Sequence, residues 1–404
     1  MTFAGAGSAI LDDLVALRRR LHADPEVGLD LPRTQGALRE QLAELDLEVT
    51  TGTGLSSITA VLRGGKPGPT VLLRADMDAL PVQEATGLSF ASTNGAMHAC
   101  GHDLHMAGLV GAARLLAARR DELEGTVVLM FQPGEEGFAG GRLMIEEGVL
   151  DASGERPVAA FAIHVDCSTD LGLFVSRPGP IMASASGLRI RVIGTGGHAA
   201  FPHLAVDPIP ASAAVVLALQ TFVSRRVPAT DPAVVSVVSI VSDSTAPNVL
   251  STTVEMMVNI RTLSRETFQL VRTSIGELVE SIASAHGCAV ETEFIDSYPV
   301  THNDDVVTRG VLDRLEEQHG GHRIHHLPAP SMASEDFAYV LDEIPGTLLF
   351  LGTRPGDLQS EGAPSMHSGV AVFDDSLLGL QAETLADLAW YALHHPTSAE
   401  RAPL

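Results

Sequence analysis

The sequence predicts an α/β protein in which a domain built on a mostly parallel sheet is interrupted by a smaller α+β domain. Three observations support this architecture. Continuous apolar and β-branched runs alternate with helical patterns towards both ends of the chain, which is typical of strands buried on both faces. At about Met182 these runs give way to alternating apolar and polar residues, the pattern of half-exposed antiparallel strands. The length of 404 residues suits two domains.

The first part of the chain carries the elements expected of the larger domain. Leucines recur on one stripe of an amphipathic helix at residues 9–22, and a second helix is expected at 33–45. Short strands are expected at 47–50, 57–62 and 70–74. A small-residue helix at 106–118 and two buried strands at 126–131 and 157–163 complete this part.

The order of the elements expected in residues 183–298 predicts the inserted domain. A half-exposed strand at 186–195 is followed by a helix at 207–225, strands at 233–241 and 252–262, a helix at 265–286 and a strand at 288–297. This β-α-β-β-α-β order is the ferredoxin-like signature. We therefore expect a discontinuous larger domain, 1–182 and 299–404, which ends in a buried strand at 346–352 and a helix at 376–394.

Composition excludes several classes of function. The net charge of −24 has the wrong sign for binding nucleic acid or an anionic membrane. Residues 1–9 lack the basic start of a signal peptide, and the apolar run 211–223 is too short to cross a bilayer. The three cysteines, Cys100, Cys167 and Cys288, cannot all pair, so we expect a reducing, cytoplasmic compartment.

Potential ligands and reactive side chains are most concentrated in M-H-A-C-G-H-D-L-H, residues 97–105, which contains three imidazoles, one thiol and one carboxylate. Cys100 and His102 are two positions apart, so in an extended or turning segment both side chains point into one cavity. A thiolate with an imidazole suits zinc, cobalt, nickel or a related divalent ion. The alternative is a buried cysteine with surface histidines at a helix start. A second cluster, G-H-R-I-H-H at 321–326, is interpreted as a solvated loop.

Polar side chains also follow the buried strands. Asp76 and Asp78 come after one strand, Glu135 and Glu136 lie in a Pro-Gly turn after the next, and His164 closes a third. Carboxyl ends of parallel strands meet at one sheet edge, where α/β proteins place their ligands. Two adjacent carboxylates suit metal-assisted hydrolysis, in which one binds the ion and the other removes a proton from water. Solvated acidic turns and a structural histidine are the alternatives.

Together these motifs resemble the amidohydrolase branch of the M20 metallopeptidase family. The motifs are L-R-A-D-M-D-A-L-P, M-H-A-C-G-H-D, F-Q-P-G-E-E, G-T-G-G-H-A-A-F-P-H and S-E-D-F, in the family's order and over nearly the whole chain. That branch includes hippurate hydrolases, aminoacylases, indole-acetyl-amino-acid hydrolases and N-acetyldiaminopimelate deacetylases. The resemblance implies hydrolysis of N-acyl-L-amino acids, a homodimer formed through the inserted lid domain, and two divalent ions (manganese, zinc, cobalt or nickel).

The resemblance also implies roles for individual residues. The metal ligands would be Cys100, His102, Glu136, His164 and His367, with Cys100 between the two ions. Glu135 matches the general acid/base. His198 matches a histidine that reaches the partner subunit's site to hold the substrate or the oxyanion. Asn248 and Arg261 match positions associated with the substrate carboxylate, and Asp78 and Asp103 would orient ligand side chains.

Some positions depart from the family pattern and bear on substrate preference. Asn259 precedes I-R-T where many relatives have Gly, Gly369 stands where Pro is common, and Asp30-Leu31 replace a usual Glu pair. Three alternative functions remain at this point. They are a dipeptidase or carboxypeptidase with the same centre, a non-catalytic metal- or amino-acid-binding protein, and an amidase that uses Cys100 as its nucleophile.

Overall fold

The computed structural model describes residues 3–356, 358 and 362–395 and divides the chain into two units. The first unit comprises Met1–Ile181, His302–Ala329 and Asp336–Leu404, and the second comprises Met182–Thr301 and Pro330–Glu335. The last of these segments differs from the predicted boundaries, which assigned it to the larger domain. It groups with the second unit because the N–H of Ala183 donates to the carbonyl oxygens of Ser331 and Ala333.

The first unit is built on an eight-stranded sheet with the order β1-β2-β4-β3-β5-β16-β6-β15. The central strands β4, β3, β5 and β16 are parallel, as are β6 and β15, whereas β1–β2, β2–β4 and β16–β6 are antiparallel pairs. The predicted mostly parallel sheet is therefore confirmed. Its strands are β1 (Glu48–Thr51), β2 (Ile58–Arg63), β3 (Lys66–Asp76), β4 (Glu124–Gln132), β5 (Ala159–Asp166), β6 (Phe174–Ser176), β15 (Ile324–His326) and β16 (Gly346–Gly352).

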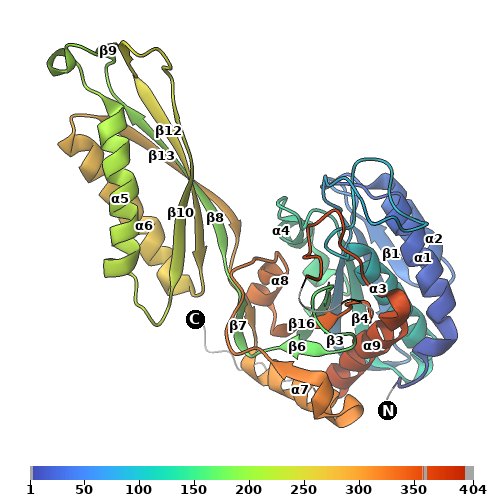
Figure 1. Ribbon diagram of the computed structural model, residues 1–404. Coiled ribbons are helices and arrows are strands. Elements are labelled where there is room, and N and C mark those ends of the chain that lie inside the picture. The colour runs from blue at the N-terminus through green and yellow to red at the C-terminus, as the bar shows by residue number, and fades with distance from the viewer. Residues whose placement is uncertain (1–2, 357, 359–361, 396–404) are drawn as a thin grey trace. The chain divides into compact units, whose positions relative to one another are not determined.

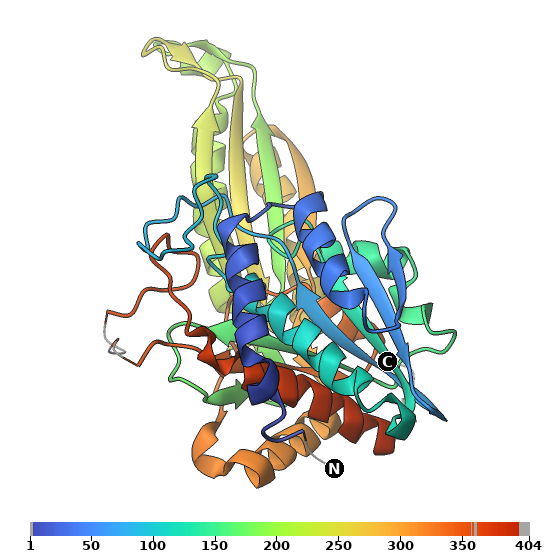
Figure 2. The same cartoon turned by 90° about the vertical axis from the view of Figure 1, so that its right-hand side faces the viewer.

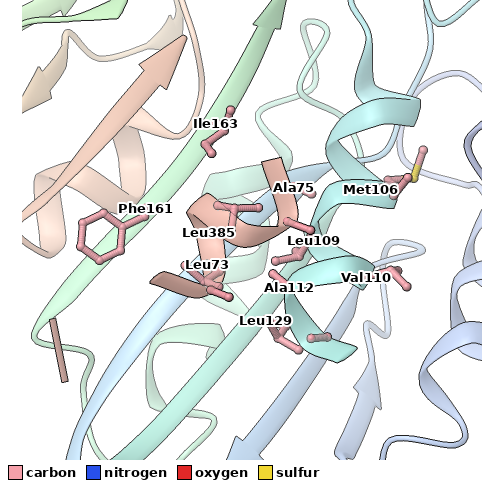
Figure 3. Close-up of a cluster of buried hydrophobic side chains, with 14 of the residues drawn as sticks. Leu73, Ala75, Met106, Leu109, Val110, Ala112, Leu129, Phe161, Ile163 and Leu385 are labelled. Carbon is pink, nitrogen blue, oxygen red and sulfur yellow. The ribbon is translucent and has the colours of Figure 1, made fainter. Parts of the chain in front are cut away.

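Helices α3 (His102–Ala117) and α9 (Leu378–His394) pack on this sheet, and α1 (Leu11–Ala23) packs against both of them (Figures 1 and 2). Figure 3 shows part of the core between them and β3, β4 and β5, with Leu73, Leu129, Ile163, Leu109 and Leu385 among the buried side chains. This core fixes the carboxyl ends of β3, β4 and β5. The unit's other helices are α2 (Pro32–Leu42), α4 (Gly140–Glu146), α7 (Asp305–His319) and α8 (Ala338–Glu343).

The second unit has a four-stranded antiparallel sheet with the order β10-β12-β8-β13. One apolar cluster joins it to α5 (Pro208–Arg226) and α6 (Arg265–Ala285). Strand order and connections are those of the predicted ferredoxin-like arrangement, which is confirmed. The strands are β8 (Ala185–Ile193), β10 (Ala233–Ser242), β12 (Thr253–Thr262) and β13 (Ala289–Tyr298), and β9 (Gly197–His198) pairs separately with β11 (Val249–Leu250). β7 (Gly179–Met182) pairs with β14 (Thr301–Asn303) where the chain leaves and re-enters the first unit.

Two local predictions differ from the structure. α3 begins at His102 rather than at residue 106, because Gly101 adopts a left-handed φ of 82° and ends the preceding turn. The cluster 321–326 is not a loop, since it forms the short 3₁₀ helix η5 (Gly321–Arg323) and then β15, which pairs in parallel with β6. Within the described residues, no helix has both the length and the apolar character needed to cross a membrane.

Candidate metal centre

The structure brings all five candidate metal ligands to one edge of the first unit's sheet. Cys100 lies in the turn before α3, His102 is the first residue of α3, and His164 belongs to β5. Glu136 follows β4, and His367 comes from the loop before α9. Because β3, β4 and β5 are parallel, the segments after them leave from the same edge. The topology thus gathers residues that are far apart in the sequence.

The donors form two overlapping groups that share Cys100. Cys100, His102 and His164 make one group, Cys100, Glu136 and His367 make the other, and the ligand atoms of each group lie within 4.8 Å of one another. The Sγ of Cys100 is 3.5 Å from Nε2 of His164 and 3.3 Å from Nε2 of His367. The same His367 nitrogen is 3.3 Å from Oε1 of Glu136. Both groups would therefore use the same sulfur atom as a ligand.

Backbone carbonyls determine which nitrogen of two histidines is available as a ligand. Nδ1 of His102 lies 2.8 Å from the carbonyl oxygen of Asp78, and Nδ1 of His164 lies 2.7 Å from that of Val165. A carbonyl oxygen only accepts, so Nδ1 carries a proton in both rings, and in the neutral form of each ring the lone pair is on Nε2. Histidines that bind metals commonly donate their other N–H in this way.

Buried atoms without partners show that a cation fits the cluster. Nε2 of His102 and Oε1 of Glu136 are both buried, and neither has a hydrogen-bond partner among the described residues. Leaving a buried polar atom unpaired costs about 1–3 kcal/mol. A divalent ion would satisfy both atoms at once, and sulfur, nitrogen and oxygen donors are those that such ions take.

The pKa values of four candidate ligands shift towards the neutral form, whereas that of His102 shifts towards the charged form. Burial opposes protonation of His102, but Asp76 and hydrogen bonds to Asp78 and Cys100 raise its pKa well above the ordinary value. Burial raises the pKa of the Glu136 carboxyl to about 7 and raises that of the Cys100 thiol above its ordinary value. Burial lowers the pKa of His164 and of His367. Without an ion, the acids therefore resist ionisation and these imidazoles resist protonation. Apart from the His102 imidazole, whose Nε2 proton a bound metal would displace, these ligands lack positive charge, and neutral imidazoles are the form that binds metals.

Asp76 and His105 lie next to His102 but form hydrogen bonds with residues outside the two groups of candidate ligands. Burial opposes ionisation of Asp76, but Arg74, His102 and His105 lower its pKa well below the usual value. Nδ1 of His105 is 2.5 Å from Oδ1 of Asp76, and its Nε2 accepts the N–H of Val165 at 2.8 Å. Both nitrogens of His105 are thus engaged, so it supports the cluster rather than joining it. No role was predicted for His105, although it lies one turn after His102 on the same helix face.

Asp78 holds the turn that carries the two adjacent glutamates. Its carboxylate oxygens accept the backbone N–H groups of Glu135 at 2.9 Å and Glu136 at 3.0 Å. Its own carbonyl accepts from His102, as described above. Asp78 is fully buried, so water does not compete for these bonds. It therefore orients His102 through its carbonyl and the turn with both glutamates through its carboxylate.

We expect Asp78→Ala to weaken metal binding and to lower kcat, each by about 10–100-fold, the usual effect of removing a group that orients metal ligands. Competition with a chromophoric chelator measures the affinity, and amine release measures kcat. Asp78→Asn keeps one acceptor oxygen and should retain part of both. Wild-type affinity and turnover in Asp78→Ala would show that the turn keeps its shape without this carboxylate.

Asp103 has partners different from those expected. Its Oδ2 accepts from Nε of Arg18 at 2.7 Å and lies 2.8 Å from Nδ1 of His22, both on α1. Burial opposes ionisation of Asp103, but Arg18 and His22 lower its pKa well below the usual value. Asp103 therefore links α3 to α1 through these contacts and does not orient a candidate ligand.

His367 adopts an unusual backbone conformation. Its φ of 64° lies in the left-handed region, and its N–H donates to the carbonyl oxygen of Ala99 at 2.9 Å, next to Cys100. Strained residues of this kind concentrate at functional sites. The nearby departure from the family pattern also has a structural reason, because a Cβ at Gly369 would lie 2.5 Å from the carbonyl oxygen of Gln83.

The candidate substrate residues belong to the second unit, in which His198 and Asn248 lie together and Arg261 lies apart from them. His198 pairs with Val249, and the carbonyl oxygen of Asn248 accepts the N–H of Ala199 at 3.0 Å. β12 begins at Thr253, a few residues after Asn248, and Arg261 lies near the carboxyl end of this strand. At about 3.3 Å per residue, the part of β12 from Thr253 to Arg261 is roughly 26 Å long, so Arg261 lies far from His198.

Arg261 has polar neighbours that bear on its proposed role. Its Nε donates to Oδ1 of Asn259 at 3.2 Å and one terminal nitrogen donates to Oγ of Ser334 at 2.8 Å. Burial lowers its pKa, although guanidinium remains charged at neutral pH. Asn259, one of the departures from the family pattern, thus contacts the candidate carboxylate-binding group directly.

An α/β sheet with these donors at its carboxyl edge defines the class of metal-dependent hydrolases. Glu135 completes the definition, because its carboxylate lies within 4.8 Å of the ligand atoms of His102 and Glu136. A carboxylate beside a metal cluster is the arrangement required for metal-assisted hydrolysis.

The chain belongs to the peptidase family M20/M25/M40, whose pattern matches residues 72–389. It is 37% identical over 387 residues to thermostable carboxypeptidase 1 of Saccharolobus solfataricus, covering 94% of this chain and 95% of the relative. It is 34% identical to an N-acetylcysteine deacetylase of Bacillus subtilis, covering 95% and 98%. It also resembles the crystal structure of a dinuclear metal-binding peptidase of the M20 family from Bacillus subtilis, with a TM-score of 0.82, 32% identity and 96% and 99% coverage.

Proposed function

We propose that this chain is a metal-dependent amidohydrolase that cleaves the amide of N-acyl-L-amino acids into a carboxylic acid and a free amino acid. The observation that carries the proposal is the pair Glu135 and Glu136, held by Asp78, with Glu136 among the candidate ligands and Glu135 beside them. A protein that only bound a metal would not need the second carboxylate. The similarity to a relative named as an N-acetylcysteine deacetylase supports this substrate class.

Two divalent ions would be held by the five ligands, with Cys100 between them. Manganese, zinc, cobalt and nickel all accept this mixture of sulfur, nitrogen and oxygen donors. When bound, such ions polarise the acyl oxygen and lower the pKa of water from about 15.7 towards neutrality. The burial that favours neutral imidazoles at His164 and His367 supports these assignments, as do the buried atoms Nε2 of His102 and Oε1 of Glu136, which form no hydrogen bond with the described residues.

Residues of the protein itself transfer the proton, stabilise the developing charge and bind the substrate. Glu135 takes a proton from the attacking water as the water oxygen bonds to the acyl carbon, and it delivers that proton to the amine nitrogen as the C–N bond breaks. His198 of the partner subunit hydrogen-bonds the acyl oxygen, on which negative charge develops. Arg261 offers the free carboxylate of the substrate a planar fork, and Asn248 of the partner subunit also binds this carboxylate.

We expect Arg261→Lys to raise KM for N-acyl amino acids by about tenfold or more, with a smaller change in kcat. Lysine keeps the charge but loses the two-pronged geometry, and a hydrogen bond to a charged group contributes about 1.5–3 kcal/mol. N-acyl amino-acid amides serve as the control, since without a carboxylate they should distinguish the two proteins poorly. Equal KM values for the acid substrates would remove Arg261 from carboxylate binding.

We also propose a homodimer formed through the second unit. β10 is an edge strand, and Val238, Ile240 and Val241 are 63%, 53% and 61% exposed. Long apolar edges are usually covered in native proteins, and a second copy would continue the sheet about a two-fold axis. The separation of His198 from Arg261 within one chain supports the same conclusion, because a partner would supply the missing histidine.

Replacing Ile240 by Lys should weaken the dimer by about a hundredfold or more, because the substitution buries an unpaired charge at the interface. Ile240 is exposed in the isolated chain, so folding of the monomer should be little affected. Sedimentation velocity across a concentration series measures the change, and Val49→Lys, on the exposed edge strand of the first unit, is the control. An unaltered dimer, or a wild-type monomer, would rule out this interface.

A cytoplasmic location is proposed from the cysteines. Cys100, Cys167 and Cys288 are all buried and unpaired. Free thiols of this kind persist in reducing compartments.

A carboxypeptidase with the same centre is the second candidate, favoured by the similarity to the Saccharolobus relative. Free-amine release from N-acyl amino acids, matched dipeptides and N-acyl amino-acid amides separates the two functions. We expect efficient cleavage of the acyl amino acids only. Preferential cleavage of dipeptides would assign the chain to the peptidases instead.

A further inference from the structure

The segment between β4 and α4 carries both adjacent glutamates and has an unusual backbone. Gly134 and Gly137 adopt φ values of 76° and 92°, and Ala139 adopts 54°. The last is unfavourable for a residue with a Cβ, so this turn keeps its shape only when its surroundings hold it. Asp78 holds its middle, as described above. A second buried carboxylate holds its two ends.

Asp336 is that carboxylate. Both of its oxygens accept from Nε2 of Gln132, at 2.7 and 2.8 Å, and Oδ2 also accepts the N–H of Gly141 at 2.8 Å. Gln132 is the last residue of β4, before the turn, and Gly141 lies in the first turn of α4, after it. One side chain therefore bridges the base of the whole segment. Asp336 and Gln132 are fully buried, so water does not compete for these bonds.

Arg74 forms ion pairs with Asp336 and with Asp76, and it thereby connects Asp336 to a carboxylate next to the candidate ligand His102. Its guanidinium donates to Oδ1 of Asp336 at 2.8 Å, to Oε1 of Gln132 at 2.9 Å and to Oδ2 of Asp76 at 2.7 Å. Asp76 in turn holds His105. A buried polar network whose members are paired in this way fixes one arrangement of its side chains.

Close packing leaves little freedom at this point. A Cβ added to Gly141 would come within 3.0 Å of the carbonyl oxygen of Asp336 and 3.3 Å of its Oδ2. Carboxylate oxygens of Asp336 and Glu135 also lie within 4.8 Å of one another. A change at Asp336 is therefore transmitted directly to the part of the turn that carries Glu135.

We propose that Asp336 is a positioning residue for Glu135 and acts by fixing both ends of the turn through Gln132 and Gly141. The inference rests on the proposed role of Glu135 as acid/base. Its kinetic signature is a lower kcat at nearly constant KM, because a displaced base weakens the chemical step while Arg261 still binds the substrate. A positioning role for Asp336 gives a function to the S-E-D-F motif, residues 334–337, which takes no part in the proposed reaction itself.

The test compares Asp336→Asn with the matched control Asp387→Asn. Asp387 is also buried and also binds an arginine and a glutamine, Arg314 at 3.0 Å and Gln318, but these partners lie on α7. Asp336→Asn keeps the shape of the side chain but removes its charge and one acceptor. We expect kcat to fall on the order of a hundredfold, the effect of a small misplacement of a reacting group, with KM within about threefold. Asp387→Asn should keep kcat within about twofold.

Hydrogen exchange on the metal-free protein gives a readout that does not depend on activity. In Asp336→Asn the peptide 132–141 should exchange at least about fivefold faster, since the N–H of Gly141 loses its charged acceptor. Asp387→Asn should leave this peptide unchanged. Gln132→Met removes a different contact of the same bridge and should act in the same direction, and its effect combined with Asp336→Asn should be less than additive.

Wild-type kcat together with unchanged exchange in Asp336→Asn would overturn the proposal, as would a rise in KM alone. Failure of the proposed function has a different signature. In that case the wild-type protein itself would release no amine from N-acyl amino acids, while the faster exchange of peptide 132–141 in Asp336→Asn would persist.

Discussion

Glu135→Gln is expected to lower kcat by about a hundredfold or more while metal content and KM change little. Glutamine has nearly the same shape as glutamate but does not accept a proton, and a positioned acid/base group contributes about 10²–10⁴-fold. The backbone N–H of Glu135 is held by Asp78 at 2.9 Å, so the turn should survive the substitution. Steady-state amine release and metal analysis of the purified protein measure the two quantities.

Glu124→Gln is the matched control, because Glu124 begins the same strand that Glu135 follows and pairs with Lys66 on the surface. It should behave as wild type. Turnover near the wild-type value in Glu135→Gln would show that this carboxylate is not the acid/base group, whatever its distance from the ligands.

The second large effect is expected from Cys100→Ala, which should reduce the bound metal below two ions per chain and abolish measurable turnover. Cys100 is the donor common to both groups, so its loss affects both ions. Even residues that only orient ligands contribute about 10–100-fold to metal affinity, and we expect a direct ligand to exceed this. Cys288→Ala, which removes a buried free thiol in the second unit, is the control.

The Cys100 experiment also separates the metal hypothesis from a cysteine nucleophile. Burial raises the pKa of the Cys100 thiol, which disfavours the thiolate that a nucleophile requires in the absence of a metal. If Cys100→Ala bound two ions as tightly as the wild type and lost only activity, the cysteine would act in the chemistry itself and not as a ligand.

Much of the fold could be predicted because local pattern and tertiary structure agree. The change from continuous apolar runs to alternation near Met182 marks the start of the ferredoxin-like unit, because buried parallel strands and half-exposed antiparallel strands have different periods. Candidate ligands such as Glu136 and His164 could be predicted to lie together because the carboxyl ends of parallel strands meet at one edge of the sheet. The short strand β15 was missed because its pairing with β6, rather than its own sequence, stabilises it.

The supporting contacts could not be predicted, because they join residues remote in sequence. Arg74 and Asp336 are 262 positions apart, and Arg18 and Asp103 are 85 apart. Nothing in the motif around Asp103 indicates that it faces α1 rather than the ligand beside it in the chain. The partners of a buried charge depend on helix and strand packing, which a single sequence does not reveal.

The most direct test of the account is amine release from an N-acyl amino acid before chelation, after chelation and after reloading with manganese, zinc, cobalt or nickel, with the bound metal counted at each stage. We predict that activity disappears with the metal and returns as two ions per chain are restored, and that Glu135→Gln stays inactive at full occupancy. Activity that survives complete removal of the metal would contradict the central claim that this cluster is a dinuclear hydrolytic centre.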